Sequence, residues 1–282
     1  MENNQKIPII YLLGAGHSGS TLLNMIMDSH SQIFGAGELF MYTKLKRRDF
    51  FCGCGKPLAS CSFWKAVFSG LNLTNLEICR KKFDFLLNKK NYFDAYTRQP
   101  INIEKYVELN EKIYRKIQKH SRKKVIFDSS KHPERAELLL KSRNLDITFL
   151  HLVRDGRGVA WSYRSKMSLL KGMRLWLMRN LKIEIIKRRN NVKYIFIRYE
   201  DFAKNPEQIV KFILKRMGLA FEPEMMEIRG AKNHQVGGNI LVRFSKIKKI
   251  EPNLDWKKEM PLFYKIIFNL LCGWLNLIYK LK

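Results

Sequence analysis

The chain has 282 residues, of which 46% are hydrophobic and 28% are charged, so it suits one large or two small globular domains and excludes a long disordered chain. Its 16 glycines and 8 prolines form no block long enough to be a linker. Lys and Arg number 53 against 25 Asp and Glu, and the net charge of +28 favours a polyanionic partner: nucleic acid, a membrane, or a phosphorylated or sulfated small molecule.

Five short apolar runs alternate with helical patterns, an order typical of a parallel α/β sheet. They are residues 7–13, 33–36, 125–127, 147–153 and 194–197. We therefore predict a three-layer sandwich in which helices flank a central parallel sheet, with the second strand beside the first. Ligands bind such open sheets beyond the carboxyl ends of the strands, and we look for site residues there.

We predict a single domain over residues 1–282, with a mostly helical insert at about 40–122 and a C-terminal helical segment at about 255–282. Within that segment, residues 266–279 are uncharged but shorter than the ~18 to 20 residues that span a bilayer. We expect a core or interfacial helix there. The N-terminal apolar run is too short for a targeting signal, so we expect a cytoplasmic protein, with peripheral contact to an anionic membrane as an option.

The first strand runs into GAGHSGSTLL, residues 14–23, and then into a helix. The glycines permit a tight turn that directs several backbone N–H groups toward one point, and the helix adds its positive end. The loop matches the phosphate-binding pattern G-x-x-x-x-G-K-[ST] at Gly14, Gly19 and Thr21, but Ser20 replaces the lysine. We interpret it as an anion cradle; the alternative is a turn without a ligand.

This loop resembles the 5′-phosphosulfate loop of the sulfotransferases, which use 3′-phosphoadenosine 5′-phosphosulfate (PAPS) and carry a small hydroxylated residue in place of the lysine. The resemblance implies a P-loop-like fold and binding of the 5′-phosphosulfate. Family members usually have Lys or Arg where this chain has His17, whose imidazole, with an ordinary pKa near ~6.5, is only partly charged at neutral pH. The residues implied are Gly16, His17, Ser18, Gly19, Ser20 and Thr21.

The third strand ends in Asp-Ser-Ser-Lys, residues 128–131. Sulfuryl transfer gathers charge on the equatorial and bridging oxygens, which a fixed cation stabilises. Lys131 resembles the lysine that follows the third strand in Golgi-type and tyrosyl-protein sulfotransferases, and His17 and Lys131 are the catalytic cations that the resemblance implies. The alternative is a helix-capping cluster beside a solvated lysine.

The fourth strand runs into a segment, residues 147–165, that resembles the 3′-phosphate motif of the same family. The resemblance assigns Arg154 at the strand end and Ser162, eight residues later, to the adenosine 3′-phosphate. An Arg fork and a hydroxyl two turns into a helix can converge on one phosphate. The alternative is a local pair between Arg154 and Asp155, which leaves the clustering of cations unexplained.

Attack by an alcohol or amine requires a base for its proton. Glu38 follows the second strand and lies 21 residues after His17, the interval between the loop arginine and the catalytic glutamate in tyrosyl-protein sulfotransferases. The alternative for Glu38 is an ordinary acidic residue at a helix start. His132 is the second candidate base, because cytosolic family members use a histidine.

Two further features carry less information. Cys52, Cys54 and Cys61 form a C-x-C-x6-C array without a fourth Cys or His nearby in the chain, so a metal there is not expected, although similar stretches occur in bacterial sulfotransferases. Gly-Gly at 237–238 permits a loop to close over the nucleotide, and Arg243 is a further candidate for the 3′-phosphate.

The resulting hypothesis is a PAPS-dependent sulfotransferase that acts on a glycan, glycolipid or small metabolite. It needs no metal, because a singly charged sulfonate requires less neutralisation than a γ-phosphoryl group. A small-molecule kinase with Mg²⁺ held by Asp155 or Asp128 is the first alternative, and the missing loop lysine argues against it. A basic nucleic-acid binding module is the second, although no recognition element is present.

Overall fold

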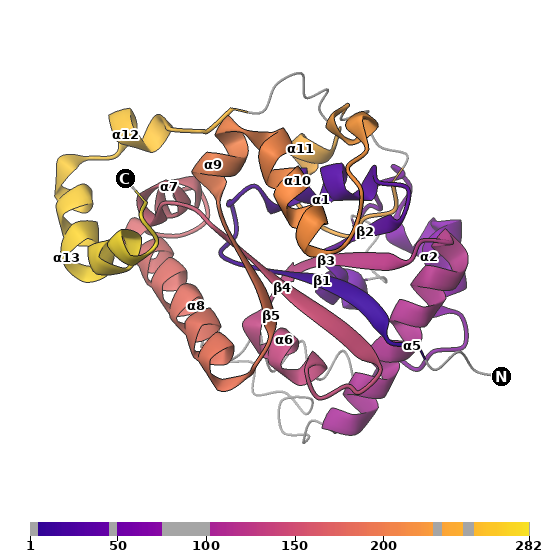
Figure 1. Cartoon of the computed structure of the whole chain (residues 1–282). Coiled ribbons are helices and arrows are strands. Elements are labelled where there is room, and N and C mark those ends of the chain that lie inside the picture. Colours follow the sequence, from indigo (N-terminus) through magenta and orange to yellow (C-terminus); the bar gives the residue numbers. More distant parts are fainter. Residues whose placement is uncertain (1–4, 45–49, 75–101, 228–232, 245–250, 282) are drawn as a thin grey trace.

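The structure, a computed structural model, describes residues 5–44, 50–74, 102–227, 233–244 and 251–281. Its centre is a five-stranded parallel sheet with the order β2-β3-β1-β4-β5 (Figure 1). The strands coincide with the five predicted apolar runs, and the α/β class is confirmed. They are β1 (Ile7–Leu13), β2 (Ile33–Gly37), β3 (Val125–Lys131), β4 (Leu145–Val153) and β5 (Lys193–Arg198).

The strand order corrects one prediction, because β3 lies between β2 and β1. Ile126 of β3 pairs with Ile9 of β1 on one side and with Phe34 of β2 on the other. The residue types explain this order. The apolar start of β3 suits the interior of the sheet, whereas β2 reads IFGAG, and a short strand with two glycines is better placed at an edge.

Helices cover both faces of the sheet, so the predicted three-layer sandwich is confirmed (Figure 1). Alternate residues of β1 serve opposite faces: Ile9 and Tyr11 pack in one core cluster, and Ile10 and Leu12 in the other. The first cluster is covered by α2 (Ser62–Phe68), α5 (Ile103–Ser121), α6 (Pro133–Leu139) and α8 (Leu169–Arg189). The second is covered by α1 (Ser20–Asp28), α9 (Tyr199–Lys204) and α10 (Pro206–Arg216).

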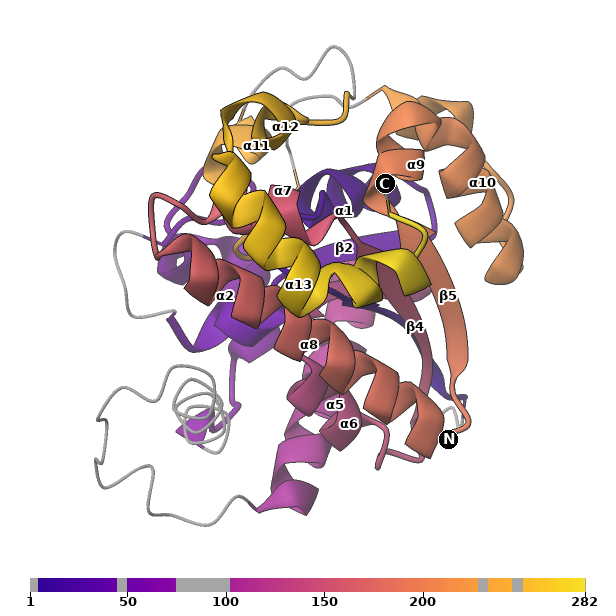
Figure 2. The same cartoon turned by 90° about the vertical axis from the view of Figure 1, so that its left-hand side faces the viewer.

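The C-terminal part packs beside the carboxyl ends of the strands. Phe268 and Cys272 join a third core cluster with Val153 and Trp176. Figure 2 shows the last helix lying on the outside of the molecule, over α8. No helix among the described residues is long and apolar enough to span a bilayer. The helices of this part are α7 (Gly156–Ser162), α11 (Ile240–Phe244), α12 (Asp255–Glu259) and α13 (Leu262–Ile278).

Between β2 and β3 the described part of the predicted insert contains α2 and α5, together with short 3₁₀ segments at Leu39–Lys44 and Leu58–Ser60. A third 3₁₀ segment, Pro223–Met226, follows α10. The rest of the insert, including Cys79, lies outside the described residues.

A late segment, residues 233–238, extends the sheet beyond β2. Val236 bridges Gly37 in parallel and Cys52 in antiparallel orientation, and it exchanges backbone hydrogen bonds with Ala36 and Glu38 (2.9 and 2.6 Å). The end of β2, the cysteine-containing loop and the segment before α11 are therefore joined at one edge. That edge carries Glu38.

Candidate active site

The glycine loop joins β1 to α1, and its conformation depends on glycine. Gly14 has a φ of 145°, and a Cβ there would lie 2.3 Å from the carbonyl oxygen of Leu152. Gly19 has a φ of 82°, and a Cβ there would lie 2.8 Å from the ring of Tyr199. The loop can therefore pass close to its neighbours only with glycine at these positions.

Several polar groups of the loop lack partners within the described part of the chain. No side chain caps the N-terminus of α1, so the first backbone N–H groups of this helix donate to no capping side chain and are available to an anion. The Ser18 hydroxyl is buried and has no hydrogen-bond partner in the described structure. Buried polar groups normally bind something, so these groups fit an anion held by the loop.

His17 contributes no positive charge to this loop at neutral pH. Its ring packs edge-on against Tyr163, with 4.5 Å between ring centroids. Burial, followed by the nearby charges of Lys166, Arg154 and Lys131, lowers the pKa of His17 to about 4. Desolvation thus favours the neutral imidazole and places the pKa of His17 below the ordinary value from which the partial charge was expected.

Lys131 supplies the cation that the loop itself lacks. It is the last residue of β3, lies opposite Leu13 of β1, and has a left-handed φ of 63°. Its Nζ lies 3.1 Å from Ser20 Oγ and 2.5 Å from Glu38 Oε1. The side chain is only 12% exposed, so its charge acts in a partly desolvated place.

Glu38 lies beside Lys131 because β2 and β3, whose ends carry these two residues, are neighbouring strands. The preceding residue, Gly37, has a φ of 74°, and a Cβ on it would lie 2.3 Å from the Val236 carbonyl oxygen. On its other side Glu38 packs against Gly237, where a Cβ would lie 3.0 Å from that of Glu38. The carboxylate is thus held between the end of β2 and the segment 233–238, facing the glycine loop.

His132, the second candidate base, is poorly suited to accept a proton. Burial, reinforced by Arg179, Arg135 and other cations, lowers its pKa to about 2. Its ring packs against Phe40 at 4.1 Å between centroids, and within the described chain its buried Nδ1 has no partner. The geometry therefore favours Glu38 over His132.

The structure brings Arg154 and Ser162 together, as the motif predicts. Arg154 Nη1 lies 2.7 Å from the carbonyl oxygen of His17 and 3.4 Å from Ser162 Oγ. Its Nη2 donates to the carbonyl oxygen of Asn253 at 2.8 Å, and its guanidinium lies over the ring of Tyr199. A buried Arg fork thus connects the glycine loop to Ser162.

The two carboxylates considered for a kinase are already paired with arginines. Asp155 Oδ2 lies 2.6 Å from Arg157 Nη2, so the local pair suggested between Asp155 and Arg154 is replaced by one with Arg157. Asp128 is fully buried against Arg135, at 3.0 Å. Neither carboxylate offers the unpaired charge that a Mg²⁺ site requires.

In the described structure Arg243 is hydrogen-bonded to other residues than Arg154 and Ser162. It is buried, and its Nη1 and Nη2 donate to the carbonyl oxygens of Gly237 and Phe51 at 3.0 and 3.1 Å. It therefore braces the segment that packs on Glu38. In the same region, the Asn239 N–H donates to Thr21 Oγ1 at 3.0 Å, which joins this segment to α1.

Sequence reasoning missed three residues of this region: Asn253, Tyr199 and His234. Asn253 and Tyr199 both contact Arg154. Tyr199 lies in the segment RYEDF, residues 198–202, directly after the fifth predicted strand, whereas no sequence pattern marks Asn253. His234 lies beside the three cysteines in space, although no fourth Cys or His is near them in the chain. Its Nδ1 lies 3.3 Å from Cys61 Sγ although 173 residues separate the two.

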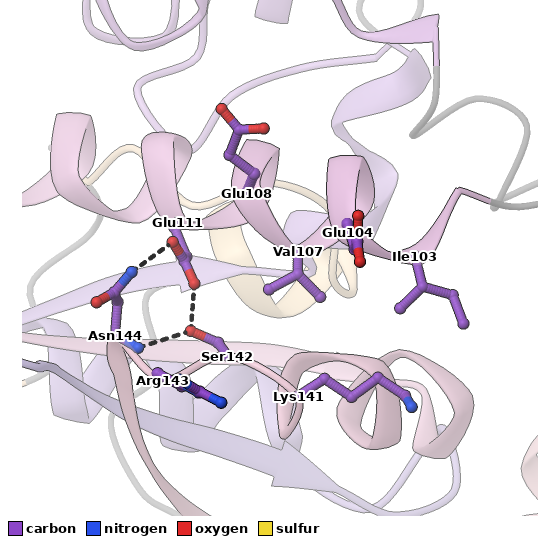
Figure 3. A pocket seen from close by; sticks show the side chains of 9 residues that line it. All are labelled: Ile103, Glu104, Val107, Glu108, Glu111, Lys141, Ser142, Arg143 and Asn144. Carbon is purple, nitrogen blue, oxygen red and sulfur yellow. Dashed lines mark hydrogen bonds between the residues drawn. The ribbon is translucent and has the colours of Figure 1, made fainter.

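A pocket at the amino end of the strands is unrelated to this site. It lies between α5 and the turn before β4, and Glu111 there already binds Asn144 and Ser142 (Figure 3). Its other carboxylates, Glu104 and Glu108, lie along the same helix (Figure 3). Catalytic sites of parallel sheets lie at the other, carboxyl end of the strands.

Comparison with known proteins identifies relatives of the chain. A family model described as "Sulfotransferase family" matches residues 8–223. The sulfotransferase domain from the Synechococcus PCC 7002 olefin synthase matches with a TM-score of 0.59 and 17% identity, over 95% of each chain. The sulfotransferase domain from the curacin biosynthetic pathway matches with a TM-score of 0.55 and 19% identity, over 94% of this chain and 97% of that one. A search of curated proteins found no match.

Proposed function

Because the chain belongs to the sulfotransferase family, we propose that it transfers a sulfuryl group from PAPS to a hydroxyl or amine of a small-molecule, glycan or glycolipid acceptor. In this proposal the glycine loop, with Ser18, Ser20 and Thr21, holds the 5′-phosphosulfate. Arg154 and Ser162 hold the 3′-phosphate. Membership of the family supports a transferase.

One observation carries the choice of donor: Arg154 contacts both the glycine loop and Ser162. Its Nη1 touches the His17 carbonyl oxygen of the loop and lies near Ser162 Oγ. A nucleotide with an anionic group on each side of its ribose needs two neighbouring anion sites of this kind. A donor with phosphates only on the 5′ side would leave the Arg154–Ser162 pair without a ligand.

The chemistry proposed for the site is an in-line displacement at sulfur. The acceptor oxygen or nitrogen forms a bond to sulfur while the bond from sulfur to the 5′-phosphate oxygen breaks. Glu38 takes the proton of the acceptor, and the leaving group is adenosine 3′,5′-bisphosphate. Lys131, 3.1 Å from Ser20 Oγ, faces the loop and stabilises the charge that develops on the bridging and equatorial oxygens.

Calorimetric titration with adenosine 3′,5′-bisphosphate tests the donor site. We expect the protein to bind this nucleotide, and Arg154→Ala to weaken binding by about 30-fold or more, because the variant removes a buried charged hydrogen-bond donor. Arg164→Ala, which changes an exposed arginine ten residues later, is the matched control and should bind normally. Wild-type protein that binds ATP with Mg²⁺ but not the bisphosphate would support the kinase alternative.

The acceptor is tested separately by supplying ³⁵S-labelled PAPS and a cell extract to the wild-type protein and to Glu38→Gln. We expect a labelled product with the wild type only. Transfer of label by both proteins at equal rates would contradict the role of Glu38, while leaving the donor assignment intact.

A further inference from the structure

Four side chains that can bind a metal lie together beside, but outside, the proposed active site. They are Cys52, Cys54 and Cys61 of one loop and His234 of the segment before α11. Their ligand atoms all lie within 4.8 Å of one another. The two segments are far apart in sequence, so the fold itself assembles this group.

The spacing of the ligand atoms matches a tetrahedral metal site. Zinc–sulfur bonds of about 2.3 Å and zinc–nitrogen bonds of about 2.0 Å place the ligands of a tetrahedron about 3.5 to 3.8 Å apart. Cys54 Sγ and Cys61 Sγ are 3.8 Å apart, and His234 Nδ1 lies 3.3 Å from Cys61 Sγ and 3.7 Å from Cys52 Sγ. A disulfide would require a sulfur–sulfur distance of about 2.05 Å.

The local sequence explains why the three thiols converge. Gly55, with a φ of 83°, closes a turn in which its N–H donates to the Cys52 carbonyl oxygen at 3.0 Å. The N–H of Cys52 in turn donates to the carbonyl oxygen of Lys56 at 2.9 Å. The short 3₁₀ segment Leu58–Ser60 then returns the chain so that Cys61 faces the turn.

The histidine is fixed independently of any metal. Trp64 Nε1 donates to the His234 carbonyl oxygen at 2.7 Å, and the ring of Phe63 stacks on the imidazole at 4.7 Å between centroids. The Gly53 N–H also donates to the carbonyl oxygen of Gln235 at 3.0 Å. These contacts hold the backbone and the ring of His234 in the position in which Nδ1 lies beside the thiols.

We propose that Cys52, Cys54, Cys61 and His234 bind one zinc ion that fastens the cysteine loop, residues 51–61, to the segment 233–238. Three thiolates and one imidazole form a soft ligand set that suits zinc. All four positions of the tetrahedron are filled by protein, so the ion has a structural role and no open position for substrate. The sequence pattern concealed the site, because the fourth ligand is distant in the chain.

The position of this zinc site links it to the catalytic edge of the protein. The segment that it holds contributes Val236, which pairs with the end of β2, and Gly237, which packs on Glu38. This consequence rests on the proposed function, whereas zinc binding itself does not. Loss of the ion is therefore expected to loosen the support of Glu38.

The first test is the metal content of the full chain. The protein is produced with added zinc and without a histidine tag, purified with reductant and without chelator, and analysed by plasma mass spectrometry. We expect about one zinc per chain for the wild type and less than about one-fifth of that for Cys61→Ser and His234→Ala. Cys272→Ser, which changes a buried cysteine of α13 outside the cluster, is the matched control and should keep the full amount.

A second measurement uses only the wild type, so it does not depend on the folding of any variant. After exchange of zinc for Co²⁺, we expect the intense visible bands of tetrahedral cobalt and a thiolate-to-cobalt charge-transfer band. A chelator should remove the metal and lower the melting temperature. Donor binding, measured in parallel, separates failure of the zinc site from failure of the proposed function.

Four outcomes would overturn the zinc site. They are wild-type protein with less than about one-fifth of a zinc per chain, octahedral cobalt spectra, iron with its coloured charge-transfer bands in place of zinc, or a Cys54–Cys61 disulfide in peptide maps of the protein purified with reductant. Loss of zinc in Cys272→Ser equal to that in Cys61→Ser would also contradict the assignment.

Discussion

At the scale of single residues, Lys131 lies between the glycine loop and the candidate base. Its ammonium lies 2.5 Å from Glu38 Oε1, so the two charges compensate each other, and 3.1 Å from Ser20 Oγ. Under the proposed function, an anion in the glycine loop would compete with Glu38 for this ammonium. We therefore expect the donor to bind before the acceptor.

Replacing Glu38 by Gln tests this role. We expect kcat to fall by about 10² to 10⁴, because the amide cannot accept the proton of the acceptor. The affinity for adenosine 3′,5′-bisphosphate should be nearly unchanged, because the glycine loop, Arg154 and Ser162, which are proposed to hold the phosphates, are not altered. Steady-state kinetics and calorimetry measure the two quantities. Glu108→Gln, on the exposed face of α5, is the control.

The opposite pattern would contradict the assignment of Glu38. If the variant lost nucleotide affinity while keeping its turnover, the carboxylate would be a structural partner of Lys131 and another group would accept the proton. His132 is not expected to take over, because burial lowers its pKa to about 2.

The strand-end residues of the site could be predicted from the sequence, and their protonation states could not. Glu38, Lys131 and Arg154 each follow a recognisable apolar run, and parallel strands bring such positions to one edge. The low pKa of His17, in contrast, depends on burial under groups more than one hundred residues away, such as Tyr163. No local sequence pattern predicts the packing of Tyr163 against His17.

At the scale of secondary structure, a buried polar network fixes the end of β3. Arg135 of α6 donates to Asp128 Oδ2 of β3 and to the hydroxyl of Tyr114 on α5, each at 3.0 Å. Asp128 Oδ1 accepts the Ser130 N–H at 2.9 Å. Because Lys131 follows Ser130 directly, this network holds the backbone next to the candidate catalytic lysine and joins three elements.

A double-mutant cycle tests that network. Arg135→Met should lower the free energy of unfolding by about 3 to 5 kcal/mol, because it leaves the buried Asp128 without its counter-charge. Combining it with Asp128→Asn should cost less than the sum of the single changes, by about 1 to 3 kcal/mol. Urea unfolding gives the values. The exposed Lys112–Glu108 pair is the control and should show no measurable coupling, and additive effects at Asp128 and Arg135 would refute the network.

The outer face of α13 exposes apolar side chains at helical spacing, the largest fractions being 77% at Leu270 and 75% at Leu277. Its inner face packs on the third core cluster. Exposed Lys257 and Lys258 precede this helix, and the whole chain carries a charge of +28. Because apolar contact and positive charge together favour an anionic membrane surface, we expect this face to bind one.

Vesicle sedimentation tests the membrane proposal. We expect binding to vesicles that contain phosphatidylserine, weaker binding at high salt, and a loss of about tenfold or more in Leu270→Asp/Leu277→Asp. Phe212→Asp, which places the same charge at an exposed aromatic position of α10, is the control. If the double variant instead converts a dimer to a monomer without affecting vesicle binding, the face of α13 contacts a second copy of the chain.

At the scale of the whole molecule, local pattern predicted the elements but not their long-range pairing. The five apolar runs predicted the five parallel strands, because a strand that is buried on both faces has a continuous apolar sequence. The edge position of β2 and the meeting of His234 with three cysteines both depend on segments distant in the chain. Neither the position of β2 nor the contact of His234 with the cysteines could therefore be predicted from a local stretch of sequence.

The histidines buried across the molecule make its stability depend on pH. Burial, as the largest cause, lowers the pKa of His151 to about 4, and also lowers those of His17 and His132. In the unfolded chain these groups take up protons near pH ~6.5, whereas in the folded protein they stay neutral. Their contribution to stability is therefore full above pH ~6.5 and is lost as the pH falls toward 4.

We expect urea unfolding to show a free energy that falls steadily between pH 7.5 and pH 5, with His151 alone contributing about 2 kcal/mol of that loss. His151→Gln should be less stable at pH 7.5, because Tyr194 and Asn180 lose well-placed partners, but its loss on acidification should be smaller by that amount. His120→Gln, at the exposed end of α5, is the control, and its free energy of unfolding should fall with pH as that of the wild type does. A flat profile, or equal losses in wild type and His151→Gln, would show that His151 gains its proton without unfolding, and the buried imidazole would then not limit acid stability.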